Sequence, residues 1–189
     1  GLTVEEVDYD TNAEVRYIFN GTTADTSSVV GNSFVKFGTQ ITVRAGEIVC
    51  IAGIDGNGQT ELVYGLTGLD KMVEGKILFN GKDITNAGIR ERSKSGMSHI
   101  PEDRHKHGLV LDYPLDYNCA LQRYFEPEFT NKFGFLRKGN IRKYAEKLIE
   151  QYDVRSGQGP ITIARSMSGG NQQKAIVARE IDKNPELLI

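Results

Sequence analysis

Long apolar runs are missing from this sequence of 189 residues. A helix that crosses a membrane needs about 20 consecutive apolar residues, and no segment comes close to that length. The N-terminal residues also lack the basic, apolar and small-residue order of an export signal, so we expect none. These absences predict a soluble protein of the cytosol.

Cysteine is scarce, and the charges nearly balance. The two cysteines, Cys50 and Cys119, provide neither a disulfide framework nor the spacing of a metal site. We expect both to be packed, reduced thiols, with Cys50 inside a buried strand. A formal net charge of -2 creates no global field that would recruit nucleic acid or an anionic membrane. With 39% hydrophobic residues, the chain can bury one sizeable core with an appended subdomain.

A glycine-rich turn is the feature around which the sequence is organised. The apolar residues 48–52 predict a strand before it, and residues 60–66 predict a helix after it. The spacing Gly53-x-x-x-x-Gly58-x-Thr60 matches the P-loop frame, in which backbone amides hold phosphates and Thr60 would bind magnesium. The candidate nucleotide-binding residues are Gly53, Asp55, Gly56, Asn57, Gly58, Gln59, Thr60 and Glu61.

The P-loop frame lacks its lysine. Gln59 stands where the frame requires a lysine, whose charge binds the outer phosphates and offsets charge in phosphoryl transfer. Glutamine donates hydrogen bonds but carries no charge. The loop therefore predicts nucleotide binding without fast hydrolysis, and an ordinary strand-to-helix turn is the alternative for the loop taken alone.

The segments around the loop predict a mixed fold. Short alternating stretches at residues 2–4, 15–19, 34–37 and 41–43 favour antiparallel strands, and Asn80-Gly81 predicts a hairpin within residues 74–84. Residues 89–94 predict a short helix, and residues 97–100 a strand. From residue 101 to about 165, aromatic residues predict the core of a small helical lobe, with Asn140 as the N-cap of a helix. A solvated face is the simplest reading of the basic residues between Arg90 and Lys106.

A second anion site is predicted near the C-terminal end. Ser168 is a good N-cap for an apolar helix at residues 172–181, and Gly169 and Gly170 leave helix-end amides open to a phosphate. A capped helix with flexible glycines is the alternative.

Three motifs in one order resemble a known family. The segment Ser168-Gly169-Gly170-Asn171-Gln172-Gln173-Lys174 is similar to the signature motif of ATP-binding cassette (ABC) transporter ATPases. The glycine loop and His99-Ile100-Pro101-Glu102-Asp103-Arg104 resemble the second cassette of the tandem ATPase subunits of importers for nucleosides and monosaccharides. The resemblance covers residues 40–189. It implies an α/β fold of the P-loop NTPase class, ABC ATPase type, with an N-terminal antiparallel β subdomain and a helical subdomain.

The resemblance also implies roles for individual residues. Thr60 and Glu102 would hold Mg²⁺ through the nucleotide, although the family usually has glutamine at the position of Glu102. The signature residues Ser168, Gly169, Gly170, Asn171 and Gln172 would contact ATP held by a second ATP-binding cassette paired head to tail. An aromatic residue would stack on adenine, and Tyr9, Tyr17 and Phe34 are the candidates.

The implied organisation has three parts and several partners. Residues 1–101 would be the nucleotide-binding core, 102–166 the helical signalling subdomain, and 167–189 the signature helix and the start of the Walker B strand. The implied partners are a transmembrane permease subunit and, indirectly, a solute-binding protein, at the cytoplasmic face of the membrane. As the alternative to a solvated face, the resemblance implies that residues 102–111 and the helical lobe meet the cytoplasmic coupling helix of the permease. Nucleic acid is not an expected partner.

Two departures from the family weaken the expected activity. Gln59 and Glu102 make the chain's own P-loop degenerate, and the sequence stops at Ile189, before the aspartate and catalytic glutamate of the family. We therefore expect a truncated fragment with no catalytic residue and negligible ATPase activity alone. A regulatory or interaction module of the same family, which binds nucleotide without driving transport, is the alternative function.

Overall fold

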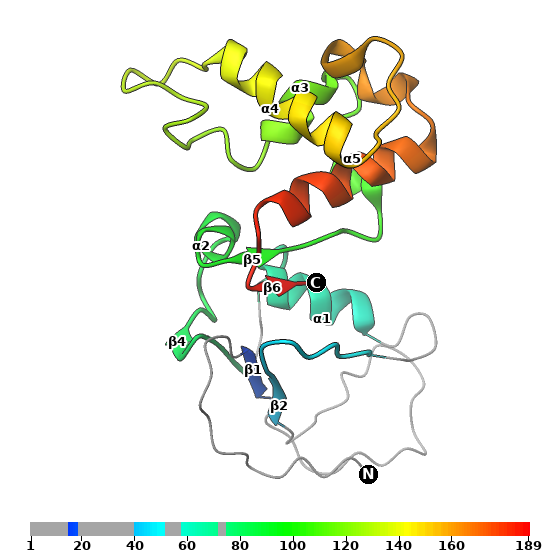
Figure 1. Cartoon of the computed structure of the whole chain (residues 1–189). Coiled ribbons are helices and arrows are strands. Elements are labelled where there is room, and N and C mark those ends of the chain that lie inside the picture. Colours follow the sequence, from blue (N-terminus) through cyan, green and yellow to red (C-terminus); the bar gives the residue numbers. More distant parts are fainter. Residues whose placement is uncertain (1–14, 19–39, 52–57, 72–74) are drawn as a thin grey trace. The chain divides into compact units, whose positions relative to one another are not determined.

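The computed structural model describes residues 15–18, 40–51, 58–71 and 75–189 (Figure 1), and for residues 15–18, 40 and 41 it describes the backbone alone. The chain divides into two compact units, Gly1–Met97 and Ser98–Ile189. The strands predicted at residues 2–4 and 34–37 lie outside the described residues.

The first unit contains an antiparallel sheet in the order β2-β1-β3-β4. Its strands are β1 (Val15–Ile18), β2 (Gln40–Val43), β3 (Lys76–Phe79) and β4 (Lys82–Asp83). Val15 pairs with Val43 on one side and with Phe79 on the other, which makes β1 a central strand. In β3, buried Ile77 and Phe79 alternate with exposed Lys76, as expected for a strand with one face on a core. The antiparallel strands predicted at residues 15–19 and 41–43 are confirmed.

The predicted hairpin is also confirmed. Asn80 and Gly81 connect β3 to β4 with φ angles of 51° and 72°. A two-residue hairpin turn of type I′ requires positive φ at both positions, and an Asn-Gly pair tolerates this conformation best.

The apolar run at residues 48–51 does not form the predicted strand, and the prediction that Cys50 is buried is wrong. Ile48 is 98% exposed, and Cys50 is exposed as well. A strand is held by backbone hydrogen bonds to a neighbouring strand, and none of the residues that the structure describes pairs with this run. Without such a partner, β-branched residues alone do not create a strand.

Two helices follow the glycine loop in sequence, α1 (Gln59–Thr67) and α2 (Ile89–Lys94). The sequence predicts both helices, and the predicted boundaries agree with the observed ones to within two residues. Arg92 of α2 is 3% exposed, so the prediction of a solvated basic face is wrong for this residue. Its guanidinium donates to four carbonyl oxygens, two of them at the end of α1 and two between β4 and α2: Gly65, Leu66, Thr85 and Ala87. These bonds satisfy carbonyls that the end of a helix leaves without a partner.

The second unit is mainly helical. After β5 (Met97–Ser98) at the boundary, its elements are the π-helical turn η1 (Arg104–Gly108), α3 (Leu115–Ala120), α4 (Lys138–Gln151), the 3₁₀ turns η2 (Gly159–Ile161) and η3 (Ala164–Ser166), α5 (Gly169–Asp182) and β6 (Leu187–Leu188). Ile189 donates to the carbonyl of Ser98 and accepts from the amide of Ile100. This exchange with residues two positions apart is the pattern of parallel strands.

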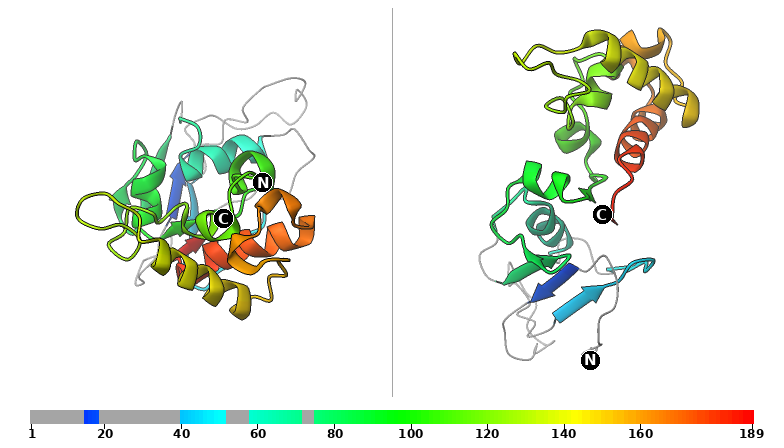
Figure 2. Two further views of the ribbon diagram at one scale, coloured as in Figure 1. Left: turned by 90° about the horizontal axis from the view of Figure 1, so that it is seen from above. Right: turned by 60° about the vertical axis from the view of Figure 1, so that its left-hand side comes forward.

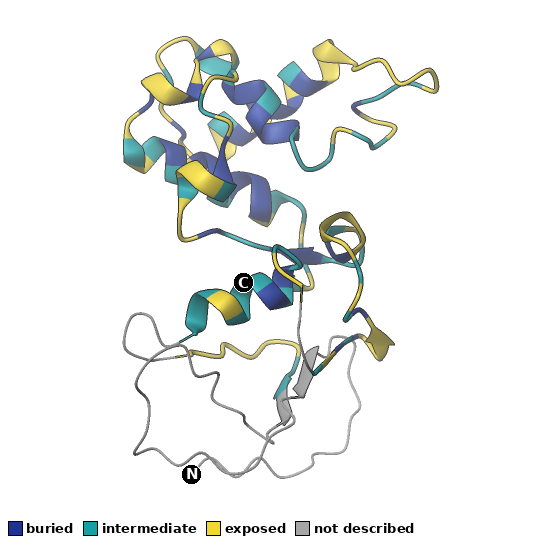
Figure 3. Cartoon of the chain, turned by 180° about the vertical axis from the view of Figure 1, so that it is seen from behind, coloured by how far each residue is buried: buried dark blue, intermediate teal, exposed yellow. Residues whose placement is uncertain are grey.

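The core of this unit lies where α3, α4 and α5 meet (Figures 2 and 3). On α4, buried Ile141, Ala145 and Leu148 recur at helical spacing and confirm the predicted amphipathic helix. Arg179 of α5 is 1% exposed, pairs with the buried Glu180, and donates to the carbonyls of Gly108 and Asn118. The buried ion pair thereby ties α5 to η1 and α3.

The predictions for the aromatic residues and for the start of α4 need correction. Phe129 is fully buried, but Tyr113, Tyr124, Phe133 and Phe135 are exposed. Phe133 and Phe135 lie on a turn that directs their side chains to solvent. The helix α4 begins at Lys138 with Arg137 as its N-cap. Asn140 is therefore inside the helix, where its side-chain amide donates to the carbonyl of Glu128.

Candidate functional site

The start of α1 has a glycine cap and no side-chain cap. Gly58 is the N-cap, with φ of 95°. Because the first amides of a helix have no partner inside it, the amides after Gly58 can serve an anion. Gln59, Thr60 and Glu61 form the first turn, where Thr60 is half-buried and Glu61 is exposed. The other loop candidates, Gly53, Asp55, Gly56 and Asn57, lie outside the described residues.

The start of α5 is capped as the sequence predicted, although the helix begins three residues earlier than expected. Ser168 has extended backbone angles, and its Oγ accepts from the backbone amide of Asn171 at 3.4 Å and from the Asn171 side-chain amide at 2.9 Å. Gly170 is exposed, and an added Cβ there would meet nothing within 4 Å. The Ser168 cap occupies one backbone amide of this helix start, that of Asn171, and a helix leaves its other first amides without a partner inside it.

Gln172 is buried and links α5 to two other segments. Its Nε2 donates to the carbonyl of Ala164 at 2.9 Å, and because a carbonyl can only accept, this bond fixes the orientation of the amide. Oε1 consequently faces Arg104 Nε at 3.3 Å and His105 Nε2 at 3.1 Å. An amide oxygen can only accept, so the contact with His105 is a hydrogen bond in the tautomer that carries its hydrogen on Nε2. The structure thus places the side chain of Gln172 inside the unit, engaged at both ends.

The π-helical turn η1 brings positive charge to the same helix start. Asp103 caps this turn by accepting from the amides of Lys106 and His105 at 3.0 Å and 2.9 Å. These bonds lower the pKa of the Asp103 carboxyl. An added Cβ at Gly169 would lie 3.0 Å from Arg104 Nη2, so a side chain there would displace the guanidinium from this position. The partial positive charge of a helix N-terminus and the full charge of Arg104 together favour an anion here.

A hollow of about 470 Å³ lies beside this helix start. Its walls are formed by residues 155–158, 162–163, 166–168 and 171. One wall is held by the amide of Arg155, which donates to Asn171 Oδ1 at 2.9 Å. The volume is within the range of small-ligand pockets. Two of the five candidate signature residues, Ser168 and Asn171, thus line the hollow, and the side chain of Gln172 is buried.

The predicted magnesium ligands belong to different units of the chain. The hydroxyl of Thr60 has no hydrogen bond to any residue that the structure describes, and Glu102 is exposed. A hydroxyl and a carboxylate oxygen are ligands that suit a hard divalent cation. Their joint action on one ion stays a prediction, and so does the choice of adenine contact. Tyr17 lies on β1, and Tyr9 and Phe34 lie outside the described residues.

Comparison with protein families gives a match to the ABC transporter family over residues 38–189. The chain belongs to the ABC transporter ATPase family. Guanosine import ATP-binding protein NupO of Bacillus subtilis (strain 168) is 54% identical to this ABC ATPase domain over 149 residues, which are 79% of the chain and 29% of NupO. Nucleoside import ATP-binding protein NupA of Lactococcus lactis subsp. cremoris (strain MG1363) is also 54% identical, over 80% of the chain and 30% of NupA. The chain thus spans less than a third of the length of these relatives.

Solved structures confirm the predicted fold class. The ADP conformation of MJ1267, an ATP-binding cassette of an ABC transporter, superposes with a TM-score of 0.64 at 19% identity, covering 94% of the chain and 68% of that protein. The dimeric cassette MJ0796 bound to ADP and Pi superposes with a TM-score of 0.66 at 16% identity, covering 92% of the chain and 72% of that protein. Within the described part of the ABC ATPase domain, no helix is both long enough and apolar enough to cross a membrane.

Sequence reasoning missed the contacts of Arg104 and His105 with the signature segment. The sequence predicts a solvated face for both residues, because acidic residues alternate with basic ones in the segment around them. A local signal existed in Asp103, which precedes three residues without β-branching and is a preferred N-cap type. The contact with Gln172, 68 positions away from Arg104, has no signal in a single sequence.

Proposed function

We propose that this ABC ATPase domain is the second, degenerate cassette of a nucleoside or monosaccharide importer, in which ATP binding and hydrolysis drive solute uptake. The similarity to NupO and NupA supports a nucleoside as the solute. At 36% identity over 151 residues, the ribose import protein RbsA of Corynebacterium glutamicum is more distant. The observation that carries the proposal is the capped start of α5, where Gly170 is exposed and Gly169 lies beneath the Arg104 guanidinium.

The start of α5 would act on ATP bound by a second cassette. Helix-end amides around Ser168, Gly169 and Gly170 would contact the γ-phosphate, because they are exposed and positively polarised. Asn171 would hold the cap, and buried Gln172 would act by positioning Arg104 and His105. Pairing of cassettes is supported by the dimeric assembly of MJ0796. The permease and the solute-binding protein would be the other partners, at the cytoplasmic face of the membrane.

The chain's own loop would bind ATP more weakly than a lysine-bearing P-loop. Residues Gly53 to Glu61 would surround the phosphates, with amides after Gly58 as donors. Mg²⁺ would be held by the Thr60 hydroxyl and approached by Glu102, and when bound it would offset phosphate charge. Glu102 itself repels phosphate, and Gln59 provides no compensating charge. The loop would therefore clamp nucleotide more than it would hydrolyse it.

Titration of magnesium-ATP against the chain and a Gln59→Lys variant tests the phosphate-binding loop. Hydrogen bonds to charged groups contribute about 1.5–3 kcal/mol, so the lysine should tighten binding about 10- to 100-fold. Gln173→Lys, on the signature helix, adds the same charge elsewhere and should leave the affinity unchanged. An unchanged affinity in Gln59→Lys would contradict the assignment of the loop.

Two further assays test the transport function. The chain alone should hydrolyse ATP far below the roughly 1–100 per second typical of phosphoryl-transfer enzymes. It should co-purify with a membrane protein that has several spanning helices. Hydrolysis at an ordinary rate would contradict the first expectation. Isolation with soluble regulatory proteins alone would favour the alternative interaction module.

A further inference from the structure

A long loop with an ordered tip connects α3 to α4. It runs from residue 121 to residue 137, a length that is uncommon in compact domains unless the loop has a function. The tip, which we define as residues 130–138 and which includes the first residue of α4, is closed by an antiparallel bridge between Thr130 and Leu136. Asn131 Oδ1 accepts from the amides of Phe133 and Phe135 at 2.9 Å and 3.0 Å. The tip therefore has a defined conformation.

Below the tip, buried aromatic contacts anchor the loop. Phe129 is fully buried, and its ring centroid lies 5.1 Å from that of Tyr144 on α4. The guanidinium of Arg123 lies 5.3 Å from both ring centroids and pairs with Glu126. The backbone amide of Arg137 also donates to the carbonyl of Phe129 at 2.7 Å. The protein thus holds the base of the loop firmly and presents its tip to solvent.

The tip exposes large apolar side chains. Phe133 is 73% exposed, Phe135 is 71% exposed, and neighbouring Leu136 is 42% exposed. Gly134 separates the two phenylalanines and has a φ of 85°, which makes the turn that directs both rings outward. Adjacent exposed apolar side chains on a rigid turn are costly to keep in water, and such patches mark interaction surfaces.

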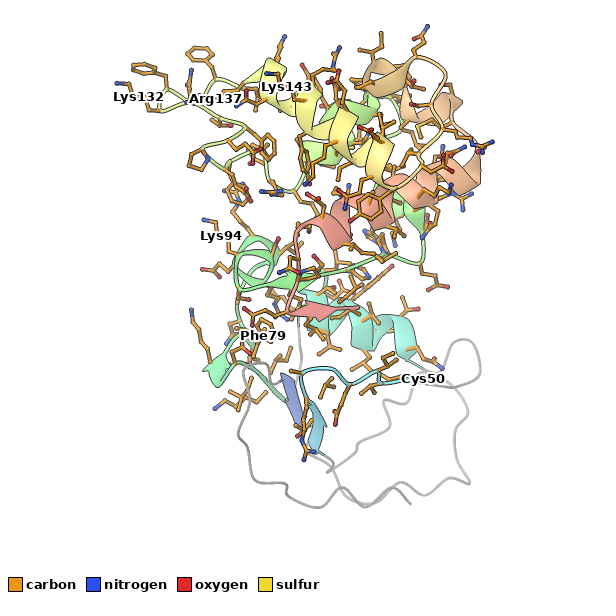
Figure 4. All side chains as sticks on the ribbon, viewed as in Figure 1. Cys50, Phe79, Lys94, Lys132, Arg137 and Lys143 are labelled. Atoms are coloured by element: carbon orange, nitrogen blue, oxygen red, sulfur yellow. The ribbon has the colours of Figure 1, made fainter. Side chains whose placement is uncertain are left out.

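The segment that carries these rings contains only positive formal charge, and Glu126 and Glu128, which precede it, pair with Arg123. Residues 129–145 contain Lys132, Arg137, Lys138, Arg142 and Lys143 and no acidic residue, although the whole chain has a formal net charge of -2. Arg142 is paired with the buried Asp116. Among the described residues, none forms an ion pair with Lys132, Arg137, Lys138 or Lys143. Figure 4 shows Lys132 and Arg137 on the loop and Lys143 on the adjoining helix.

We propose that the 130–138 tip binds directly to an anionic lipid surface. Phe133, Phe135 and Leu136 would enter the interface between headgroups and acyl chains, while the flanking cations would contact lipid phosphates. Long basic side chains can reach headgroups while apolar neighbours sit deeper. A lipid surface supplies both an apolar layer and dense negative charge, and it requires no shaped pocket. This contact is independent of both nucleotide sites and adds to attachment through a permease.

Sedimentation of the 189-residue chain with protein-free vesicles tests the lipid contact. We expect binding to vesicles of phosphatidylcholine and phosphatidylglycerol in equal parts, and little binding to phosphatidylcholine alone. Each basic residue near an anionic membrane contributes about fivefold to partitioning, so Lys132→Gln/Arg137→Gln should weaken binding about 25-fold. Lys71→Gln/Lys82→Gln removes two exposed charges elsewhere and should change it little. About 0.5 M KCl should release the wild-type chain.

The apolar part of the contact has its own controls. Phe133→Ser/Phe135→Ser should weaken vesicle binding at least tenfold, whereas Ile89→Ser/Ile181→Ser removes exposed apolar groups elsewhere and should not. The sequence contains no tryptophan, so Phe133→Trp gives a single fluorescence reporter. Its emission should shift to the blue with anionic vesicles, and that of Tyr113→Trp should not. Phe133 and Phe135 are largely exposed, so the thermal unfolding of the tip variants should match the wild type.

Several results would overturn the proposal. The wild-type chain would fail to bind vesicles, or the tip and control variants would lose vesicle binding equally. Alternatively, the emission of the tryptophan at position 133 would not shift to the blue with anionic vesicles. Loop-dependent binding to single-stranded RNA or to a detergent-solubilised membrane protein, without vesicle binding, would assign the tip to a different partner and refute the lipid contact.

Discussion

The contact between η1 and α5 can be tested with one added methyl group. A Cβ at Gly108 would lie 2.5 Å from Ile176 Cδ1, whereas carbon atoms in contact prefer about 3.5–4.0 Å. Ile176 is fully buried, beside Leu109 and Ala164, so its side chain has little room to move. Overpacking of this kind typically costs about 1–3 kcal/mol, and we expect Gly108→Ala to lower the free energy of unfolding by that amount.

A double-mutant cycle separates this clash from other effects of the alanine. Ile176→Val removes Cδ1 and should cost about 0.5–1.5 kcal/mol alone. The nearest atoms to the new Cβ would then be 3.4 Å away, so the double variant should be at least about 1 kcal/mol more stable than the sum of the single effects predicts. Gly139→Ala adds a methyl group to α4 with nothing within 4 Å, and it should be neutral or stabilising by about 0.4–1 kcal/mol.

Urea unfolding followed by circular dichroism measures all four variants. The midpoint should fall for Gly108→Ala, and the midpoint of the double variant should lie above the value that the sum of the single effects predicts, with an unchanged slope. Additive effects within about 0.5 kcal/mol, or a neutral Gly108→Ala, would refute the packing of η1 against α5.

Three further predictions concern other buried groups. Arg92→Lys should destabilise the chain by about 2 kcal/mol or more, because lysine cannot serve four separate carbonyls; an unchanged urea midpoint would contradict this. Phe129→Ala should cost about 3–5 kcal/mol and Phe133→Ala almost nothing, and equal effects would refute the anchored-base description. Burial raises the pKa of the Cys119 thiol from 9.0 to about 12, so the free energy of unfolding should fall as pH rises through this range, because the unfolded thiol ionises first. In the native chain, a thiol reagent should accordingly modify exposed Cys50 promptly and Cys119 only on unfolding.

The elements that the sequence predicted well are those with a strong local signal. The Asn80-Gly81 hairpin depends on two residues that accept positive φ, and α4 depends on apolar residues at helical spacing. The cap at Ser168 is likewise a short-range contact. In each case, residues within one or two turns of the chain determine the conformation.

The errors arose where distant residues decide the outcome. Residues 48–51 have a strand-like composition but no strand partner among the described residues. Arg92 has the sequence context of a surface residue, yet four carbonyls from separate segments enclose its guanidinium. Phe133 and Phe135 have the same composition signal as the buried Phe129, but the Asn131 turn directs their rings outward. For the site, the two helix starts were predictable, and the contact of Arg104 and His105 with Gln172 was not.

Sedimentation velocity of the Gln59→Lys variant with magnesium-ATP tests the central claim most directly. In an ATP-dependent dimer, the start of α1 from one chain and the start of α5 from the other chain would have to contact the same nucleotide. We predict a dimer that forms only with ATP, and a monomer when Ser168→Arg is added, since the arginine would block the start of α5 without touching the chain's own loop. A dimer that persists with Ser168→Arg, while ATP binding is unaltered, would contradict the assignment of residues 168–172 to the ATP of a partner cassette.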